Sequence, residues 1–511
     1  MRRLGWLSLV FILWLACGRI TNGLHAAQLV RGPYLQAQTS ESIIIRWRTD
    51  VPTESVVNFG THSSDFPVAF DPTLTNEHIV RLSGLAPATR YFYSVGSRTE
   101  LLAQGPSCRF VTAPTSGQNV STRVWALGDS GGLSYGETNV IPMRDAYYSF
   151  TQTRRSDVWL LLGDNAYEDG TDEEYQVNFF DVFSSLLRQL PPSPAIGNHE
   201  TYSADGTGWF PYLGVFSTPT NGQSGGIPSG SKRYYSFNYG NIHFVSLDAM
   251  AQSRTPDGPM ATWLRADLDA NTNLWLIAFW HHPPYSKGSH DSDREIELIE
   301  MRQYIVPILE AHGVDVVLCG HSHNYERSFL LHGHYGFSTN LSSSMILDAG
   351  SGRQGDTGAY VKVNSGPQAN KGTVYIVAGS AGDIEPRFGH HPAMFTDAAS
   401  IGSVVIDINT NRLDARFVLA TGQIADSFTI IKGGPPPLQF SNFNIQNMIV
   451  VARWRSVPGM AYQVERTENF VTPVWQPVGP PVFATGATTC WTNPVAPGAP
   501  LGYFRLSQEV P

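Results

Sequence analysis

Five apolar stretches of the chain each end in polar side chains that can bind metal ions. In chain order these side chains are Asp129, Asp164, Asn198 with His199, His281 with His282, and His321 with His323. In four of the five stretches a glycine comes directly before the first polar residue. In α/β proteins the carboxyl ends of the strands carry the functional groups, and glycine allows a sharp turn there. Carboxylate, amide and imidazole groups without thiolates suit transition-metal ions rather than a structural zinc site.

The number of these groups predicts a dinuclear metal site. Seven or eight ligands exceed what one ion needs, whereas two ions about 3.5–4 Å apart that share one carboxylate would use them all. Such a pair can bind a bridging hydroxide and hold a phosphoryl group, which is the arrangement used for phosphate ester hydrolysis. Each stretch taken alone has a simpler explanation, as a turn residue or a hydrogen-bonded core histidine. The five together favour the metal site.

The last stretch, "VDVVLCGHSHNYE", places two histidines one residue apart. Residues i and i+2 of a strand point to the same side, so we expect His321 and His323 to aim their imidazoles at one point. Cys319 is expected to end the buried strand, and Gly320 to make the turn that follows.

The elements that must position these groups lie between residues 121 and 432. Apolar strands alternate there with amphipathic helices, which predicts an α/β domain of layered β-sheets flanked by helices. The stretch "DREIELIEMRQYIVPILEAHG" has apolar residues at helical spacing, and the aromatic alternation of "RYYSFNYGNIHFVSLD" predicts a β-hairpin.

Two further regions flank this domain, and both are predicted to be β structure. Residues 28–115 alternate apolar and polar residues, and "LSGLAPATRYFYSV" resembles the fibronectin type III pattern, which implies a β-sandwich. Residues 433–437, within "KGGPPPLQF", have the composition of a linker. Residues 438–511 contain short strands such as "MIVVARWRS", which predict a small β domain without a catalytic cluster.

Length and composition limit the class of protein. The chain has 511 residues, of which 42% are hydrophobic and 15% charged, which indicates a folded protein of several domains. Its net charge of -9 argues against nucleic acid or an anionic membrane as a partner. Four cysteines spread along the chain do not make a disulfide scaffold. The oligomeric state stays open.

The N-terminus predicts export. Arg2 and Arg3 precede an apolar stretch that runs from Leu4 to Ala16, and polar residues and then a small-residue site near Ala26 follow. This pattern predicts a signal peptide over residues 1–26 and a secreted protein, extracellular or periplasmic. Cys17 could instead be a lipid-attachment cysteine. The apolar stretch is too short to span a membrane, and no other segment is long enough.

The ordered motifs resemble those of the calcineurin-like metallophosphoesterase superfamily. They are Asp129-x-Gly131, Gly163-Asp164-x-x-Tyr167, Gly197-Asn198-His199-Glu200, His281 and Gly320-His321-x-His323. Within that superfamily, Tyr167 in Gly-Asp-x-x-Tyr and the fibronectin-like N-terminal region are similar to the purple acid phosphatases. The resemblance covers residues from about 28 to 430 and implies a metallophosphoesterase fold.

The resemblance also implies a ligand set for two metal ions. Asp129, Tyr167 and His323 would bind the first ion and Asp164 would bridge. Asn198, His281 and His321 would bind the second ion. A tyrosinate ligand suits ferric iron, and the divalent partner in this family is zinc, manganese or iron. His282 is the alternative to His281, but an extended segment would point it to the opposite side.

Two more histidines are implied to act on the substrate. His199 resembles the family's substrate-contacting histidine. His290 lies nine residues beyond His281, near the place where plant members carry a His-His pair, although Asp291 replaces the second histidine. The hypothesis is that His199 and His290 bind phosphate oxygens and that one of them protonates the leaving alkoxide. A mobile loop position is the alternative for His290.

The leading functional prediction is an exported dinuclear-metal phosphatase that hydrolyses small phosphate monoesters through a metal-bound hydroxide with histidine assistance. A phosphodiesterase or nucleotide pyrophosphatase would use the same site on another substrate. A non-catalytic β-sandwich adhesion protein is the third alternative, but such a protein would be expected to have lost ligands, and none of the seven is missing.

Overall fold

The computed structural model describes residues 26–62, 67–364, 367–433, 438, 440–456, 461–486, 488–496 and 502–509. Residues 1–25 of the predicted signal peptide, including Cys17, and residues 434–437 of the predicted linker lie outside this part. Among the described residues, no helix has both the length and the apolar character needed to cross a membrane.

The N-terminal region is a curved, six-stranded antiparallel sheet around its own apolar core. Its strands are β1 (Leu29–Gln36), β2 (Ser42–Gly60), β3 (Val68–Ser83), β4 (Arg90–Gly96), β5 (Leu101–Ala103) and β6 (Arg109–Val111). The first half of β2 pairs with β1 and its second half with β4, while β3 pairs with both halves. The alternating residues Ile43, Ile45 and Trp47 point into the core, as the period of two predicts.

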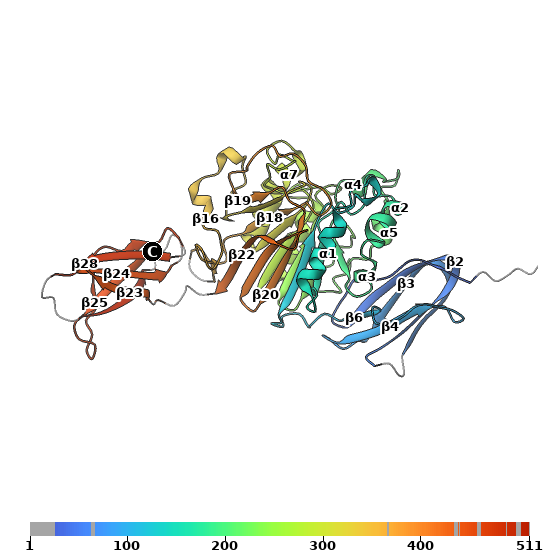
Figure 1. Cartoon of the computed structure of the whole chain (residues 1–511), viewed down its shortest axis with the longest axis horizontal. Helices are drawn as coiled ribbons and strands as arrows, with labels where there is room; N and C mark the ends of the chain where they lie inside the picture. Colours follow the sequence, from blue (N-terminus) through green and yellow to red (C-terminus); the bar gives the residue numbers. More distant parts are fainter. Residues whose placement is uncertain are drawn as a thin grey trace, which may run out of the picture.

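Two seven-stranded sheets form the centre of the molecule (Figure 1). The first has the order β17 (Tyr360–Val363), β22 (Ile424–Gly433), β21 (Arg412–Leu419), β20 (Gly402–Asn409), β7 (Thr122–Leu127), β8 (Val158–Leu161) and β9 (Pro192–Pro194). The second has the order β10 (Tyr235–Tyr239), β11 (Ile242–Ser246), β12 (Trp275–Phe279), β13 (Val316–Cys319), β18 (Val374–Ala378), β14 (Tyr325–Ser328) and β19 (Met394–Ala398). Strands β15 (Leu330–Leu331) and β16 (Ile346–Asp348) pair separately.

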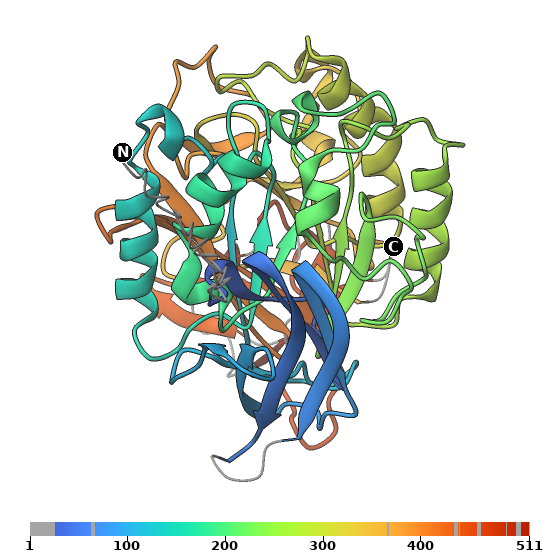
Figure 2. The same cartoon turned by 90° about the vertical axis from the view of Figure 1, so that its right-hand side faces the viewer.

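The two sheets pack face to face through one apolar core, and helices cover their outer faces (Figure 2). Val124 and Ala126 of β7 point into the core between the sheets, whereas Trp125 and Leu127 point to the outer face. Buried parallel strands must be apolar on both faces, which explains why these runs are continuous rather than alternating. The predicted hairpin is β10–β11, and the predicted layered sheets with flanking helices are confirmed.

The helices lie in two groups. The first sheet is covered by α1 (Val140–Thr151), α2 (Asp172–Tyr175), η2 (Gln176–Phe180) and α3 (Ser184–Leu187). The second is covered by α6 (Pro259–Ala270) and by the continuous segment α7 (Ile296–Glu300), η3 (Met301–Ile305) and α8 (Val306–Ala311). Short elements in loops are η1 (Leu133–Tyr135), α4 (His199–Tyr202), α5 (Pro211–Val215), η4 (Ser338–Asn340) and η5 (Ser343–Met345).

The C-terminal region has two small sheets around a core that includes Trp454 and Trp491. Strands β23 (Phe440–Gln446), β24 (Ile449–Arg455) and β28 (Thr488–Pro494) form one sheet. Strands β25 (Ala461–Thr467), β26 (Gln476–Pro477), β27 (Val482–Phe483) and β29 (Tyr503–Glu509) form the other.

An ion-pair cluster joins the N-terminal region to the central domain. The guanidinium of Arg31, which is 2% exposed, donates to Asp172 at 2.9 Å, and Arg48 pairs with the same carboxylate. These two arginines hold the pKa of Asp172 at about 2, against the effect of its partial burial. The contact therefore fixes β1 and β2 to the start of α2.

Candidate metal centre

The site forms where the carboxyl ends of both sheets meet. Asp129, Asp164 and Asn198 follow β7, β8 and β9 of the first sheet. His281 follows β12, and His321 and His323 follow β13 of the second sheet. With Tyr167, which also follows β8, four of the seven donors come from the first sheet and three from the second, and one apolar core packs between the two sheets.

Glycines are required at these strand ends because the turns are crowded. A Cβ at Gly197 would lie 2.1 Å from Oδ1 of Asp164, and one at Gly320 would lie 2.4 Å from Oδ2 of Asp129. Asp129, Asp164 and His321 themselves have φ values of 59°, 53° and 69°, a region that is costly for side chains with a Cβ. The backbone is thus strained in order to aim three of the donors.

One group of donors centres on the Tyr167 hydroxyl. This hydroxyl lies 3.2 Å from Oδ1 of Asp129, 3.2 Å from Nε2 of His323 and 3.4 Å from Oδ2 of Asp164. Burial and the neighbouring carboxylates raise the pKa of Tyr167 well above its usual range. Without a cation at this place the phenol stays protonated. The arrangement therefore suits a phenolate only where a strong positive charge is added.

The second group centres on Nε2 of His281. It lies 3.0 Å from Oδ2 of Asp164 and 3.1 Å from Oδ1 of Asn198. Single donor atoms of Asp164, His281 and His321 all lie within 4.8 Å of one another, a group that could hold a metal ion. His281 Nδ1 lies 2.8 Å from the carbonyl oxygen of Leu162, which orients the ring and directs Nε2 toward the other donors.

The charges within the site compensate one another. Burial alone would lower the pKa of His281, but the carboxylates of Asp164 and Asp129 raise it to about 10. In return, the charge of His281 outweighs burial and lowers the pKa of Asp164. Burial would also lower the pKa of His323, but its bond to Asp129 raises that pKa to about 9. The imidazoles of His281 and His323 thus balance the negative charge of the carboxylates.

Glu200, the last residue of the Gly-Asn-His-Glu motif, fastens two of the turns together. Its fully buried carboxylate accepts backbone N–H bonds from Asp164 at 2.8 Å, Asn165 at 2.6 Å and Gly197 at 2.6 Å. Burial and the nearby Asp164 raise the pKa of Glu200. This one side chain therefore sets the position of the loops that carry Asp164 and Asn198.

Sequence reasoning missed Glu295, which lies among the histidines of the second sheet. Its carboxylate lies 2.9 Å from Nδ1 of His290 and 3.1 Å from Nε2 of His321, and the two rings have centroids 3.7 Å apart. The histidine partners lower the pKa of Glu295 against the effect of its burial. His290, Glu295 and His321 make a second group that could hold a metal ion. Only an acidic residue five positions after His290 could have indicated it.

His199 lies on the opposite side of the site. Its Nδ1 lies 2.6 Å from the carbonyl oxygen of Glu168, and its ring meets that of Tyr167 edge-on, with centroids 4.4 Å apart. Its backbone N–H donates to Oδ1 of Asp164 at 3.0 Å. His199 and His290 thus lie beside the two different donor groups.

The strand argument for His321 and His323 was wrong in its geometry. Strand β13 ends at Cys319, which is buried as expected, and the left-handed turn at His321 breaks the alternation. His321 therefore faces His281 and Glu295, whereas His323 faces Tyr167 and Asp129. His282 is buried against His321, with ring centroids 4.3 Å apart.

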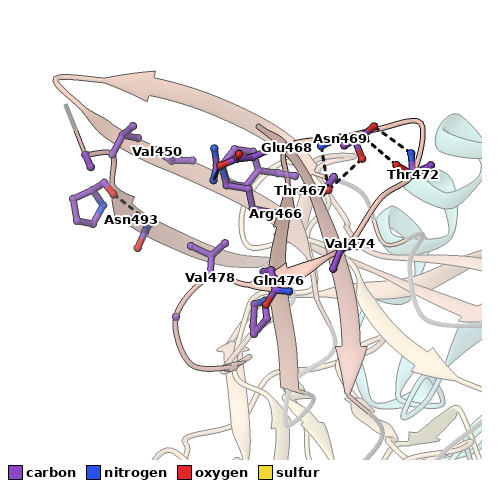
Figure 3. Close-up of a pocket in the computed structure, with 16 residues that line it drawn as sticks. Val450, Arg466, Thr467, Glu468, Asn469, Thr472, Val474, Gln476, Val478 and Asn493 are labelled. Atoms are coloured by element: carbon purple, nitrogen blue, oxygen red, sulfur yellow. Dashed lines mark hydrogen bonds and ion pairs between the residues drawn. The ribbon is translucent and has the colours of Figure 1, made fainter. Parts of the chain in front are cut away.

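A cavity of about 830 Å³ in the C-terminal region offers a different chemistry (Figure 3). It is lined by Arg466, Glu468 and Asn469, along with apolar residues such as Val450 and Val474. No histidine is among its lining residues, and Glu468 is the only acidic one. This lining therefore does not resemble the donor set of the central domain.

The seven predicted ligands meet the requirements of a dinuclear centre. The structure brings all seven together, through the two groups around Tyr167 and His281. Asp164 contacts both groups, as a shared carboxylate must. The donor set mixes carboxylate, phenol, amide and imidazole, and no thiol takes part. These residues fit two metal ions.

Family comparisons match two separate parts of the chain. Residues 122–325 match the family model described as calcineurin-like phosphoesterase, and residues 31–112 match the purple acid phosphatase N-terminal domain. The second match covers the region with the fibronectin-like pattern.

Individual relatives agree with these matches. Purple acid phosphatase 15 of Arabidopsis thaliana is 32% identical over 279 residues, which are 49% of this chain and 49% of that protein. Acid phosphatase type 7 of Homo sapiens is 28% identical over 67% of this chain and 75% of that protein. The chain therefore spans about half the length of the Arabidopsis relative.

Solved structures share the fold. The purple acid phosphatase PPD1 from yellow lupin (Lupinus luteus) seeds has a TM-score of 0.60 and 17% identity, and the match covers 79% of this chain and 75% of that one. The structure of PhoD has a TM-score of 0.54 and 13% identity, over 80% and 94% of the two chains. At these identities the likeness concerns the fold alone.

Proposed function

The chain is a purple acid phosphatase-like member of the calcineurin-like phosphoesterases, and from this we propose that it is an exported dinuclear-metal hydrolase of phosphate monoesters. The observation that carries the proposal is the meeting of seven donors from five strand ends, with Asp164 shared by both groups. Export rests on the N-terminal sequence, in which Arg2 and Arg3 precede an apolar stretch.

The proposed ligand roles follow the two groups. Asp129, Tyr167 and His323 would hold one ion, which the phenol suits when it is ferric iron. Asn198, His281 and His321 would hold a divalent ion of zinc, manganese or iron, and Asp164 would bridge. Bound in this way, the two ions would polarise the phosphoryl group and activate water for attack.

We infer that two histidines of the chain, His199 and His290, act on the substrate. Nδ1 of His290 is engaged by Glu295, and Nδ1 of His199 by the carbonyl oxygen of Glu168. In both rings Nε2 is therefore the nitrogen left to meet a phosphate oxygen or the leaving oxygen. We assign proton donation to His290, because the contact of Nδ1 with Glu295 fixes the ring and leaves Nε2 to meet the leaving oxygen.

The test is metal analysis of the purified protein together with a panel of phosphate esters. We expect about two metal ions per chain and faster turnover of p-nitrophenyl phosphate than of bis(p-nitrophenyl) phosphate. A faster diester reaction would assign the same site to a phosphodiesterase. Asp164→Asn is expected to lower kcat at least about 10³-fold, whereas Asp257→Asn, at an exposed position, leaves kcat unchanged. Equal activity of both variants would contradict the dinuclear mechanism.

The iron assignment has its own readout. A tyrosinate bound to ferric iron absorbs in the visible range, so Tyr167→Phe is expected to abolish that absorption in metal-replete protein. An unchanged visible spectrum in this variant would exclude Tyr167 as the iron ligand.

A further inference from the structure

A cavity of about 450 Å³ lies between the N-terminal region and the central domain, and arginines dominate its wall. Arg90 and Arg109 come from β4 and β6, and Arg154 and Arg155 from the loop between α1 and β8. Figure 1 shows β6 close to the lower ends of α1 and α3. We call this cavity the arginine pocket.

The two arginines of the N-terminal region face the same way. Strands β4 and β6 are antiparallel, with Arg90 opposite Val111 and Phe92 opposite Arg109. Since residues i and i+2 share a face, Arg90 and Arg109 are diagonal neighbours on one face of this strand pair. Within the described residues, neither guanidinium has a hydrogen-bond or ion-pair partner. Like charges at this spacing repel each other unless an anion lies between them.

The central domain adds positive charge that its own residues compensate only in part. Asp157, the only acidic residue of the wall, accepts a bond from Arg154 at 3.1 Å and one from the backbone N–H of Arg123 at 2.8 Å. Nη1 of Arg155 is buried and has no hydrogen-bond partner in the described part of the chain. Basic residues after α1 also counter the negative end of that helix. This explanation covers Arg154 and Arg155 but leaves out Arg90 and Arg109, which come from another region.

We propose that the arginine pocket binds a small, multiply charged oxyanion of the phosphate type. Guanidinium groups bind tetrahedral oxyanions through paired N–H bonds, and a cavity of about 450 Å³ has room for one or two phosphoryl groups. The chain has a net charge of -9, so general electrostatic attraction would not gather anions here. The attraction is local to the four arginines.

The arginine pocket is separate from the metal centre. Asp157 directly precedes β8, whereas Asp164 follows that strand. Six residues lie between the two, four of them in strand β8, so they are about 20 Å apart along the chain. A bound anion would therefore touch both structural regions without reaching the metal ligands, and we expect it to stabilise their contact.

The experiment counts binding sites by calorimetric titration of the metal-replete protein with methylenediphosphonate, which a phosphatase cannot hydrolyse. The wild-type protein is expected to bind one more equivalent than Arg90→Ser/Arg109→Ser, and the added site is expected to weaken at least tenfold in 0.5 M NaCl. Both proteins should turn over p-nitrophenyl phosphate at the same rate, because the metal centre is untouched.

A matched control is Arg81→Ser/Arg98→Ser, which removes two arginines of the same region outside the pocket. It should keep the wild-type stoichiometry. Equal stoichiometry in the wild type and Arg90→Ser/Arg109→Ser, or equal loss in the control, overturns the proposal. A further arm measures cosedimentation with phosphatidylglycerol vesicles. If the wild type and the control bind the vesicles and Arg90→Ser/Arg109→Ser does not, the anion in the pocket is a lipid headgroup.

Discussion

The two ends of strands β7 and β8 carry opposite chemistries. At the carboxyl ends, carboxylates and imidazoles compensate one another, as Asp164 does with His281 and Glu295 with His290. At the amino ends, the arginine pocket contains Arg90 and Arg109 without such compensation. The negative charge of these carboxylates is therefore balanced by neighbouring imidazoles. In the described part of the chain Arg90 and Arg109 have no such partner, and in our proposal an anion from outside balances their charge.

Among the variants that test this comparison, the largest effect is expected for the proton donor at the carboxyl ends. His290→Ala is expected to lower kcat about 10²-fold or more for an alkyl phosphate, because the leaving alkoxide then lacks its proton donor. The loss should be much smaller for p-nitrophenyl phosphate, whose leaving group needs no proton. An equal loss for both substrates would assign His290 to phosphate binding instead. His62→Ala, at an exposed histidine, serves as the control.

The next effect tests the compensation of buried charge at Glu200. Glu200→Gln replaces an acceptor oxygen by an amide and leaves at least one of the backbone N–H groups of Asp164, Asn165 or Gly197 unsatisfied. We expect a loss of about 1–3 kcal/mol in the free energy of unfolding, measured by denaturant titration, and weaker metal retention during dialysis. Unchanged metal retention would show that Glu200 does not position the ligands.

A smaller effect compares the arginine pocket with compensated arginines at the same domain contact. Asp172→Asn removes the carboxylate that Arg31 and Arg48 share, while Arg48 keeps its ion pair with Glu77, and is expected to cost about 1–2 kcal/mol at pH 7. The pKa of Asp172 is lowered in the folded state to about 2, so its contribution is complete above about pH 4 and is lost as the pH falls toward 2. The difference in unfolding midpoint between wild type and variant should therefore shrink from pH 7 to pH 3. A constant difference would contradict the ion-pair explanation.

The smallest effect is expected for Arg90 and Arg109 of the arginine pocket. Without an added anion, Arg90→Ser/Arg109→Ser should leave stability unchanged or raise it by about 0.2–0.5 kcal/mol, because it removes a repulsion. The gain should disappear in high salt. A loss of stability similar to that of Asp172→Asn would show that the two arginines have partners within the protein.

The residues predicted from the sequence are those whose signal is local. Asp129, Asp164 and His281 each follow an apolar run, and the glycines before most strand ends mark the turns, so the layered sheets and the donor set could be read from short segments. Glu295 is the N-cap residue of the helical segment that begins at Ile296, and its contacts with His290 and His321 cannot be read from the helical pattern. Arg90 and Arg109 meet the residues after α1 only through the packing of two regions, which no local pattern reports.

The predicted direction of the histidines after β13 was wrong for a related reason. Strand alternation holds only while the backbone stays extended, and the chain turns at His321. The sequence pattern thus predicts which residues are donors. It does not predict which of the two groups His321 and His323 join, because that depends on the left-handed turn at His321.

The division of the donors between two stacked sheets has a mechanical consequence. His281 follows a strand of the second sheet, but its ring contacts the carbonyl oxygen of Leu162, which follows a strand of the first sheet. The site therefore connects the two sheets. A movement of one sheet relative to the other would change the distances between the donors without breaking the hydrogen bonds between strands. Metal binding at this site would therefore depend on how closely the two sheets pack.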